Sequence, residues 1–115
     1  MRDLPGDWFP EVAVDFDGTL AEYNGWQGST HIGKPIPIML QRVKAWCAEG
    51  RSVVIFTARL SGTKIEADNA KALIQKWLVD NGLPKLDVTN IKRKSFVEFW
   101  DDRAIRVERN TGVVR

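Results

Sequence analysis

The sequence is poor in the residues that mark several common classes of protein. Its 115 residues contain one cysteine, Cys47, and one histidine, His31, which excludes an internal disulfide and argues against a zinc site built on clustered Cys and His. No apolar run approaches the length of a membrane span, and the first residues lack a secretory pattern. The formal net charge of +2 is too small to require a nucleic-acid partner. We therefore expect a cytoplasmic protein without membrane contact and with a reduced thiol at Cys47.

The residues that are present fit a single domain over 1–115. Hydrophobic residues make up 43% of the chain and charged residues 28%, the balance of an ordinary globular protein. Apolar runs and helical patterns alternate: strands are expected from Val12 and over 52–57, 86–91 and 97–100, a candidate fifth strand over 104–107, and helices between 35–50 and 70–82. This order predicts an α/β protein with a three-layer, Rossmann-like fold, in which helices flank both faces of a mostly parallel sheet.

The strand that begins at Val12 ends in two acidic residues, Asp15 and Asp17. Strand alternation places both carboxylates on one side of the chain and Phe16 on the other. Two carboxylates at the end of a buried strand repel each other unless a cation lies between them or one of them holds a proton. The pair therefore predicts a divalent metal site in which one carboxylate attacks and the other transfers protons.

Polar residues also end the other predicted strands. Thr57 follows the second strand, Lys92 the third, and Asp101 and Asp102 the fourth. Ligand sites of open α/β sheets lie beyond the carboxyl ends of the strands. We therefore expect these side chains to meet the first acidic pair at one edge of the sheet.

Four short segments carry a resemblance to a known family. Asp15-Phe16-Asp17-Gly18-Thr19 matches a first motif, Phe56-Thr57-Ala58-Arg59 is similar to a second, Lys92 occupies the place of a third, and Trp100-Asp101-Asp102-Arg103 resembles an acidic fourth. Together they resemble the haloacid dehalogenase superfamily of phosphohydrolases, over about residues 12–105. Because no stretch is long enough for a separate cap domain, the chain resembles a small, capless member.

The resemblance implies a Mg²⁺-dependent phosphatase that works through a phosphoaspartate. Asp15 would be the nucleophile, and Asp17 the general acid and base. Mg²⁺ would be held by Asp15, the main-chain carbonyl of Asp17 and one carboxylate of the pair Asp101 and Asp102. Asp101 is favoured as the direct ligand, with Asp102 positioning a water or Lys92.

The second motif and the turn after the first would bind the phosphoryl group. Thr57 and the backbone amides at Gly18 and Ala58 would hold its oxygens. Gly18 suits this place because a Cβ would obstruct the approach of the backbone to phosphate, and Thr19 would hold the turn through its hydroxyl. Arg59 could reach a phosphate or a substrate carboxylate, or lie in a solvent-facing loop.

Lys92 would offset negative charge in the transition state. Lys94 lies two residues further along and would face the same way in an extended stretch, so periodicity does not choose between the two lysines. The family position favours Lys92.

The segment Glu22–Lys34 is rich in glycine and polar residues, which predicts turns or a small hairpin. It can form a flap but no cap, so the site should be open to a large or exposed phosphorylated substrate, or be covered by another subunit of a homo-oligomer. His31 in this flap is a candidate substrate contact. Trp8 and Trp26 could line a site or a subunit contact, with core as the default. Trp46 and Trp77 lie at helical spacing with apolar residues, which predicts core positions for both.

Other functions share this chemistry. The substrate could be a small phosphorylated molecule or a phosphate-ended nucleic acid, which the Lys92-Arg93-Lys94 cluster would suit. The chain could instead transfer the phosphoryl group to an acceptor other than water. A third alternative is a regulatory module that binds metal and phosphate without turnover, although the second acid at Asp17 argues against it.

Overall fold

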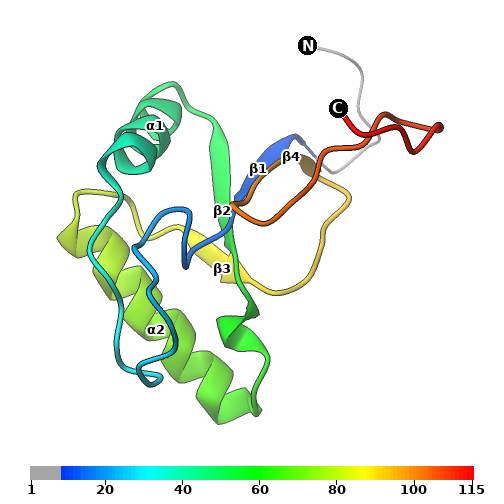
Figure 1. The fold of residues 1–115 in the computed structure, drawn as a ribbon. Coiled ribbons are helices and arrows are strands. Elements are labelled where there is room, and N and C mark those ends of the chain that lie inside the picture. The colour runs from blue at the N-terminus through cyan, green and yellow to red at the C-terminus, as the bar shows by residue number, and fades with distance from the viewer. Residues whose placement is uncertain (1–8) are drawn as a thin grey trace.

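The structure is a computed structural model that describes residues 9–115 (Figure 1). Trp8, a candidate site residue, lies outside the described residues. Four strands and two α-helices follow one another along the chain, with a short 3₁₀ helix between the second strand and the second α-helix. They are β1 (Glu11–Val14), α1 (Pro37–Ala48), β2 (Ser52–Phe56), η1 (Ala58–Leu60), α2 (Lys64–Asp80), β3 (Asp87–Thr89) and β4 (Phe96–Trp100).

The four strands form one parallel sheet in the order β3-β2-β1-β4. The chain therefore builds outward from β1 through β2 to β3, and then returns through residues 90–95 to add β4 on the other side of β1. Because all strands run in the same direction, their carboxyl ends share one edge. The sequence-based prediction of an α/β fold with a parallel sheet is confirmed.

Both helices pack on the same face of the sheet (Figure 1). Alternation sends Val12 and Val14 of β1, and Val53 and Ile55 of β2, toward this face. The main core joins them to apolar residues of both helices, namely Met39, Leu40, Val43, Trp46, Ile74 and Leu78. Trp46 is buried, as its helical spacing predicted. Together, α1 and α2 thus cover one face of the sheet.

The opposite face carries no helix within residues 9–115, so the predicted three-layer arrangement is wrong for this part of the chain: the fold has two layers. The reason is the connection between β3 and β4, which spans 90–95 and is too short for a crossover helix. A small cluster of Ala13, Val54 and Phe96, with Phe56 against it, lies on this face. Phe56, Phe96 and Phe99 pack edge-to-face, with ring centroids 5.7–6.1 Å apart.

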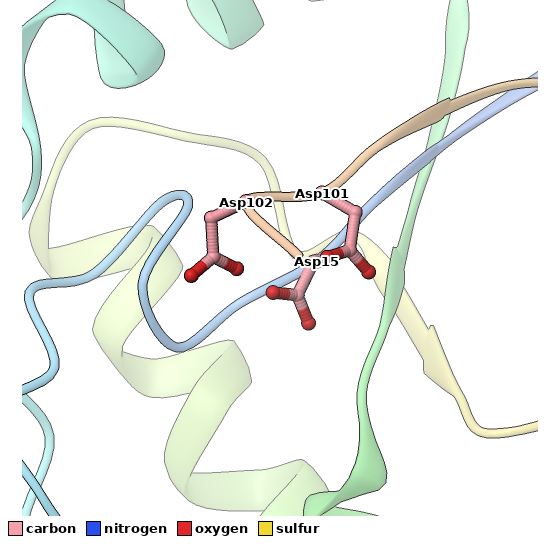
Figure 2. A group of neighbouring side chains, drawn as sticks. All are labelled: Asp15, Asp101 and Asp102. Atoms are coloured by element: carbon pink, nitrogen blue, oxygen red, sulfur yellow. The ribbon is translucent and has the colours of Figure 1, made fainter. Parts of the chain in front are cut away.

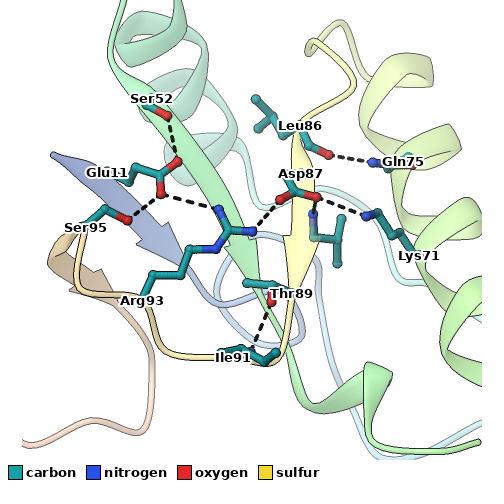
Figure 3. Close-up of polar contacts among 11 residues, drawn as sticks. Glu11, Ser52, Lys71, Gln75, Leu86, Asp87, Thr89, Ile91, Arg93 and Ser95 are labelled. Atoms are coloured by element: carbon teal, nitrogen blue, oxygen red, sulfur yellow. Dashed lines mark hydrogen bonds and ion pairs between the residues drawn. The ribbon is translucent and has the colours of Figure 1, made fainter. Parts of the chain in front are cut away.

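Arg93 fixes the β3–β4 connection across this open face (Figure 3). Its guanidinium lies between Glu11 at the start of β1 and Asp87 at the start of β3, and it pairs with both carboxylates. Glu11 also accepts hydrogen bonds from Ser52 (3.0 Å) and Ser95 (2.6 Å). This network ties the amino-terminal ends of all four strands together and leaves the carboxyl ends to the candidate site.

Several predicted boundaries shift. The candidate fifth strand over 104–107 is not formed: Val107 makes an isolated bridge to Val114 instead. The helix expected over 70–82 begins earlier, at Lys64, because Thr63 and Glu66 form a capping box.

Neither α-helix of the described chain has both the length and the apolar character that a membrane crossing requires.

Candidate metal and phosphate site

Three carboxylates meet at the carboxyl edge of the sheet (Figure 2). Asp15 follows β1, and Asp101 and Asp102 follow the neighbouring strand β4. One oxygen from each lies within 4.8 Å of the others. The two segments are held in register by the backbone, since the Asp15 N–H donates to the Trp100 carbonyl (2.9 Å). The structure therefore brings the predicted first and fourth motifs together.

Thr19 joins the two motifs through a single hydroxyl. Its oxygen accepts from the Asp102 N–H (3.0 Å) and lies 3.2 Å from a carboxylate oxygen of both Asp102 and Asp15. The side chain is buried, so water cannot readily replace these contacts. Sequence reasoning assigned Thr19 only to the local turn and missed this link, because no local pattern indicates a partner 83 residues away.

Gly18 permits the close approach of the same turn. Its φ of +85° lies in the left-handed region, and a Cβ there would stand 2.6 Å from an Asp102 carboxylate oxygen. A side chain at this position would therefore displace a member of the acidic cluster.

Burial, and after it the neighbouring acids, raises the pKa of Asp15. Burial raises its pKa to about 7, and the charge of Asp101 and a hydrogen bond with Asp102 act in the same direction. Hydrogen bonds from Thr19 and the Phe16 backbone oppose the rise without cancelling it. A bound cation would favour the charged carboxylate instead.

The Asp17 carboxylate lies outside the acidic cluster and is held by Arg59. Arg59 Nε donates to one oxygen (2.7 Å) and Nη2 to the other (2.9 Å). The same Nη2 donates to the His31 carbonyl (2.9 Å), and the guanidinium lies 5.3 Å from the ring centre of Trp26. The Arg59 side chain is only 8% exposed. Arg59 lines the cleft with Asp15 and Thr57, so a contact with substrate stays a prediction; its pair with Asp17 was not predicted.

The predicted phosphate-binding segment begins where β2 ends. Thr57 is buried, and its hydroxyl accepts from the Arg59 N–H (3.2 Å), which caps η1. Asp15, Asp17, Asp101 and Asp102 share with Thr57, Ala58 and Arg59 the lining of one cleft of about 800 Å³. Tyr23, Trp26, Asn90 and Arg103 add further polar and aromatic groups to its walls. This cleft could accommodate a phosphate group together with a sizeable attached group.

Lys92 is not among the residues that line the cleft. Its ammonium lies 5.3 Å from the ring centre of Phe99, on the helix-free face of the sheet. Phe99 in turn packs against Phe56, which does line the cleft. Two aromatic rings, Phe99 and Phe56, therefore connect Lys92 to the cleft, and the structure does not bring this lysine to the acidic cluster as the sequence predicted.

The flap Glu22–Lys34 forms neither a strand nor a helix. Of the two predictions, turns or a small hairpin, it contains turns. Hydrogen bonds from Glu22 N–H to the Lys34 carbonyl (2.8 Å) and from Ile36 N–H to the Leu20 carbonyl (2.8 Å) close its base. The Trp77 indole N–H adds a third anchor by donating to the Gly33 carbonyl (3.0 Å).

The donor set at the carboxyl edge fits Mg²⁺. Asp15, Asp101 and Asp102 offer hard oxygen ligands, and neither sulfur nor imidazole belongs to the cluster. Asp101 and Asp102 are exposed, which leaves room for the waters that Mg²⁺ retains. The Asp17 carboxylate does not join this cluster, so a contribution from this residue would have to come from its main-chain carbonyl, as predicted.

Comparison with known proteins identifies a fold but no activity. No protein-family model matches the chain, and no curated protein matches it. A solved structure described as that of a conserved protein from Bacteroides thetaiotaomicron is similar, with 26% sequence identity and a TM-score of 0.58. The similarity covers 84% of this chain and 78% of that one. It supports the α/β fold over most of the chain.

Proposed function

We propose that the protein is a Mg²⁺-dependent phosphohydrolase of the haloacid dehalogenase type, acting on phosphomonoesters through a phosphoaspartate at Asp15. One observation carries this proposal: carboxylates from two distant segments, Asp15 and the pair Asp101 and Asp102, converge in a cleft that also contains the Thr57 hydroxyl. Repulsion among three acids is costly without a cation, and a cation beside a hydroxyl is suited to bind phosphate.

The residues divide the reaction between them. An Asp15 oxygen attacks phosphorus, a new O–P bond forms, and the bond from phosphorus to the ester oxygen breaks. To act as the acid, Asp17 must hold a proton, which requires one of its oxygens to leave the Arg59 guanidinium. It then gives this proton to the departing oxygen, and later removes a proton from the water that attacks the phosphoaspartate and restores Asp15.

Mg²⁺ held by the acidic cluster would neutralise the charges that otherwise keep carboxylate and phosphate apart. The Thr57 hydroxyl and the Ala58 amide would orient the phosphoryl oxygens. The Gly18 amide, which the sequence also suggested for this role, donates to the Ala21 carbonyl instead (2.7 Å).

The test is phosphate release from an aryl phosphate, with and without Mg²⁺. We expect release to depend on Mg²⁺, to stop on chelation, and to fall by at least about a thousandfold in Asp15→Asn. Asp17→Asn should slow both formation and breakdown of the phosphoenzyme. Asp68→Asn is the matched control, since Asp68 is exposed on α2 and pairs with Lys64 away from the site. Undiminished release by Asp15→Asn would reject the mechanism.

The Arg59 pair also supports one alternative. Both oxygens of the proposed acid and base are engaged by a guanidinium, an arrangement that suits a module that binds metal and phosphate with little turnover. Calorimetry would distinguish the two: Mg²⁺ binding together with no phosphate release from any ester would favour the binding module.

A further inference from the structure

Two large aromatic side chains of the flap are exposed in the same cleft as the acidic cluster. Tyr23 is 47% exposed and Trp26 is 61% exposed, and both line the cleft that contains Asp15 and Thr57. Aromatic rings that stay accessible beside polar groups at a concave site are suited to bind a ligand. The phosphate-binding end of the cleft therefore has an aromatic surface next to it.

Trp26 is held in place although it is exposed. The Arg59 guanidinium lies 5.3 Å from its ring centre, and Arg59 is itself fixed by Asp17 and the His31 carbonyl. The cation–π contact limits motion of the indole without burying it. A ring that is already ordered loses little entropy when a second flat group stacks on it.

The cleft combines ionic and aromatic groups. The acidic cluster would need Mg²⁺ before it could accept phosphate, and Arg103 lines the same cleft as a further cation. Tyr23 and Trp26 add flat apolar surface and one phenol hydroxyl, and the guanidinium beside the Trp26 ring, that of Arg59, is already paired with Asp17. Groups suited to an anion and to a flat ring therefore share one cavity of about 800 Å³.

We propose that the cleft binds phosphomonoesters in which a planar aromatic ring is attached close to the phosphate, with a nucleoside 5′-monophosphate as the representative ligand. The base stacks on Trp26 while the phosphate lies at Asp15 and Thr57. The inference rests on the proposed phosphatase function and specifies its substrate class. Stacking on an aromatic side chain tolerates any base, so the preference should be for the presence of a base over its identity.

The first test compares a nucleoside 5′-monophosphate with ribose 5-phosphate, which has the same sugar and phosphate but no base. We expect kcat/KM to be at least about tenfold higher for the nucleotide, the size of one stacking contact. Trp26→Ala should remove this preference and Trp26→Phe should keep much of it. Ile65→Ala, at an exposed position on α2, should leave the ratio as it is. Equal kcat/KM values for both esters in the wild-type protein would overturn the inference.

A binding measurement separates this inference from the proposed function. Asp15→Asn cannot form the phosphoenzyme, so calorimetry with Mg²⁺ can follow its binding of both esters. Tighter binding of the nucleotide that is lost on adding Trp26→Ala supports the aromatic subsite even if the wild-type protein releases no phosphate. Phosphate release with no difference in binding between the two esters overturns the subsite and leaves the phosphatase intact. A kcat/KM that rises with the length of 5′-phosphorylated oligonucleotides would overturn the assignment to a single nucleotide.

Discussion

The guanidinium of Arg59 donates two hydrogen bonds to the Asp17 carboxylate, one to each oxygen, at 2.7 Å and 2.9 Å. The same side chain binds the His31 carbonyl, so one residue after β2 orients the proposed proton-transfer group and anchors the flap. Planar, two-point contacts of this kind need a guanidinium. Arg59 therefore connects Asp17, the proposed acid and base, to the flap Glu22–Lys34.

We expect Arg59→Lys to lower kcat for phosphate release by about tenfold, since an ammonium cannot make the two-point contact that orients Asp17. Amide hydrogen exchange across Glu22–Lys34 should become faster at the same time, because the His31 carbonyl loses its partner. Arg51→Lys, at a more exposed ion pair with Glu98, serves as the control. Unchanged exchange in the flap of Arg59→Lys would contradict the anchoring role.

The raised pKa of Asp15 predicts a pH-dependent effect of Mg²⁺ on stability. The pKa of Asp15 is about 7 in the folded protein against an ordinary 3.8, so the folded protein holds this proton more strongly. The protonated group therefore stabilises the metal-free fold fully below about pH 4, and this stabilisation is lost as the pH rises toward 7. Mg²⁺ requires the charged carboxylate, so we expect a larger rise in Tm on adding Mg²⁺ at pH 8 than at pH 5.5. Thermal melts of the wild type and Asp15→Asn check this; an equal Mg²⁺ effect at both pH values would refute it.

Gly18→Ala should weaken Mg²⁺ binding by more than the strain of a left-handed alanine alone explains. Left-handed conformation costs an alanine about 1–2 kcal/mol, and the new Cβ would also push against Asp102. Gly50→Ala is matched in backbone strain, with φ +82° and no atom within 4 Å of the Cβ. Chemical denaturation should find similar strain in both variants, whereas Mg²⁺ titration should find weaker binding in Gly18→Ala alone.

Removal of the Thr19 hydroxyl should loosen the link between the two halves of the acidic cluster. We expect Thr19→Val to lose about 1–2 kcal/mol of unfolding free energy, because the Asp102 N–H is left without its partner. Affinity for Mg²⁺ should fall as well. Thr19→Ser keeps the hydroxyl and should retain both properties; a Thr19→Val protein with wild-type Mg²⁺ affinity would show that the link is dispensable.

The choice between Lys92 and Lys94 can be made with a pair of variants. Lys92→Gln should lower kcat by about tenfold or more if this ammonium offsets charge in the transition state, and Lys94→Gln should have little effect. Lys92 rests against Phe99, next to the Phe56 wall of the cleft, which favours it over its neighbour. The reverse order of effects would assign the role to Lys94.

Local sequence patterns predicted the elements and the edge of the sheet on which the site lies. The Val-rich run before Asp15 is a continuously buried strand, and a largely exposed strand at the edge of the sheet ends just before Asp101. Parallel order places the carboxyl ends of these two strands together. Such patterns do not specify what covers the second face of the sheet. There the outcome depends on the length of the 90–95 connection and on Arg93, which anchors it to Glu11 and Asp87.

Contacts between distant side chains were the part of the site that could not be predicted. Arg59 was expected to face a ligand or solvent, and its pair with Asp17 was not foreseen. Thr19 was assigned a local role, and it also binds Asp102. Both contacts depend on the packing of loops at the carboxyl edge, and a single sequence contains no signal for loop packing.

The position of β4 has a consequence for the order in which the molecule assembles. β1, β2 and β3 form from neighbouring stretches of chain, whereas β4 must close the longest loop in the sheet to reach β1. We therefore expect β4 to dock last during folding. A nascent chain would have Asp15 in place early and would lack the other two acids until the segment that contains β4 emerged, so an affinity for divalent ions would mark the docking of β4.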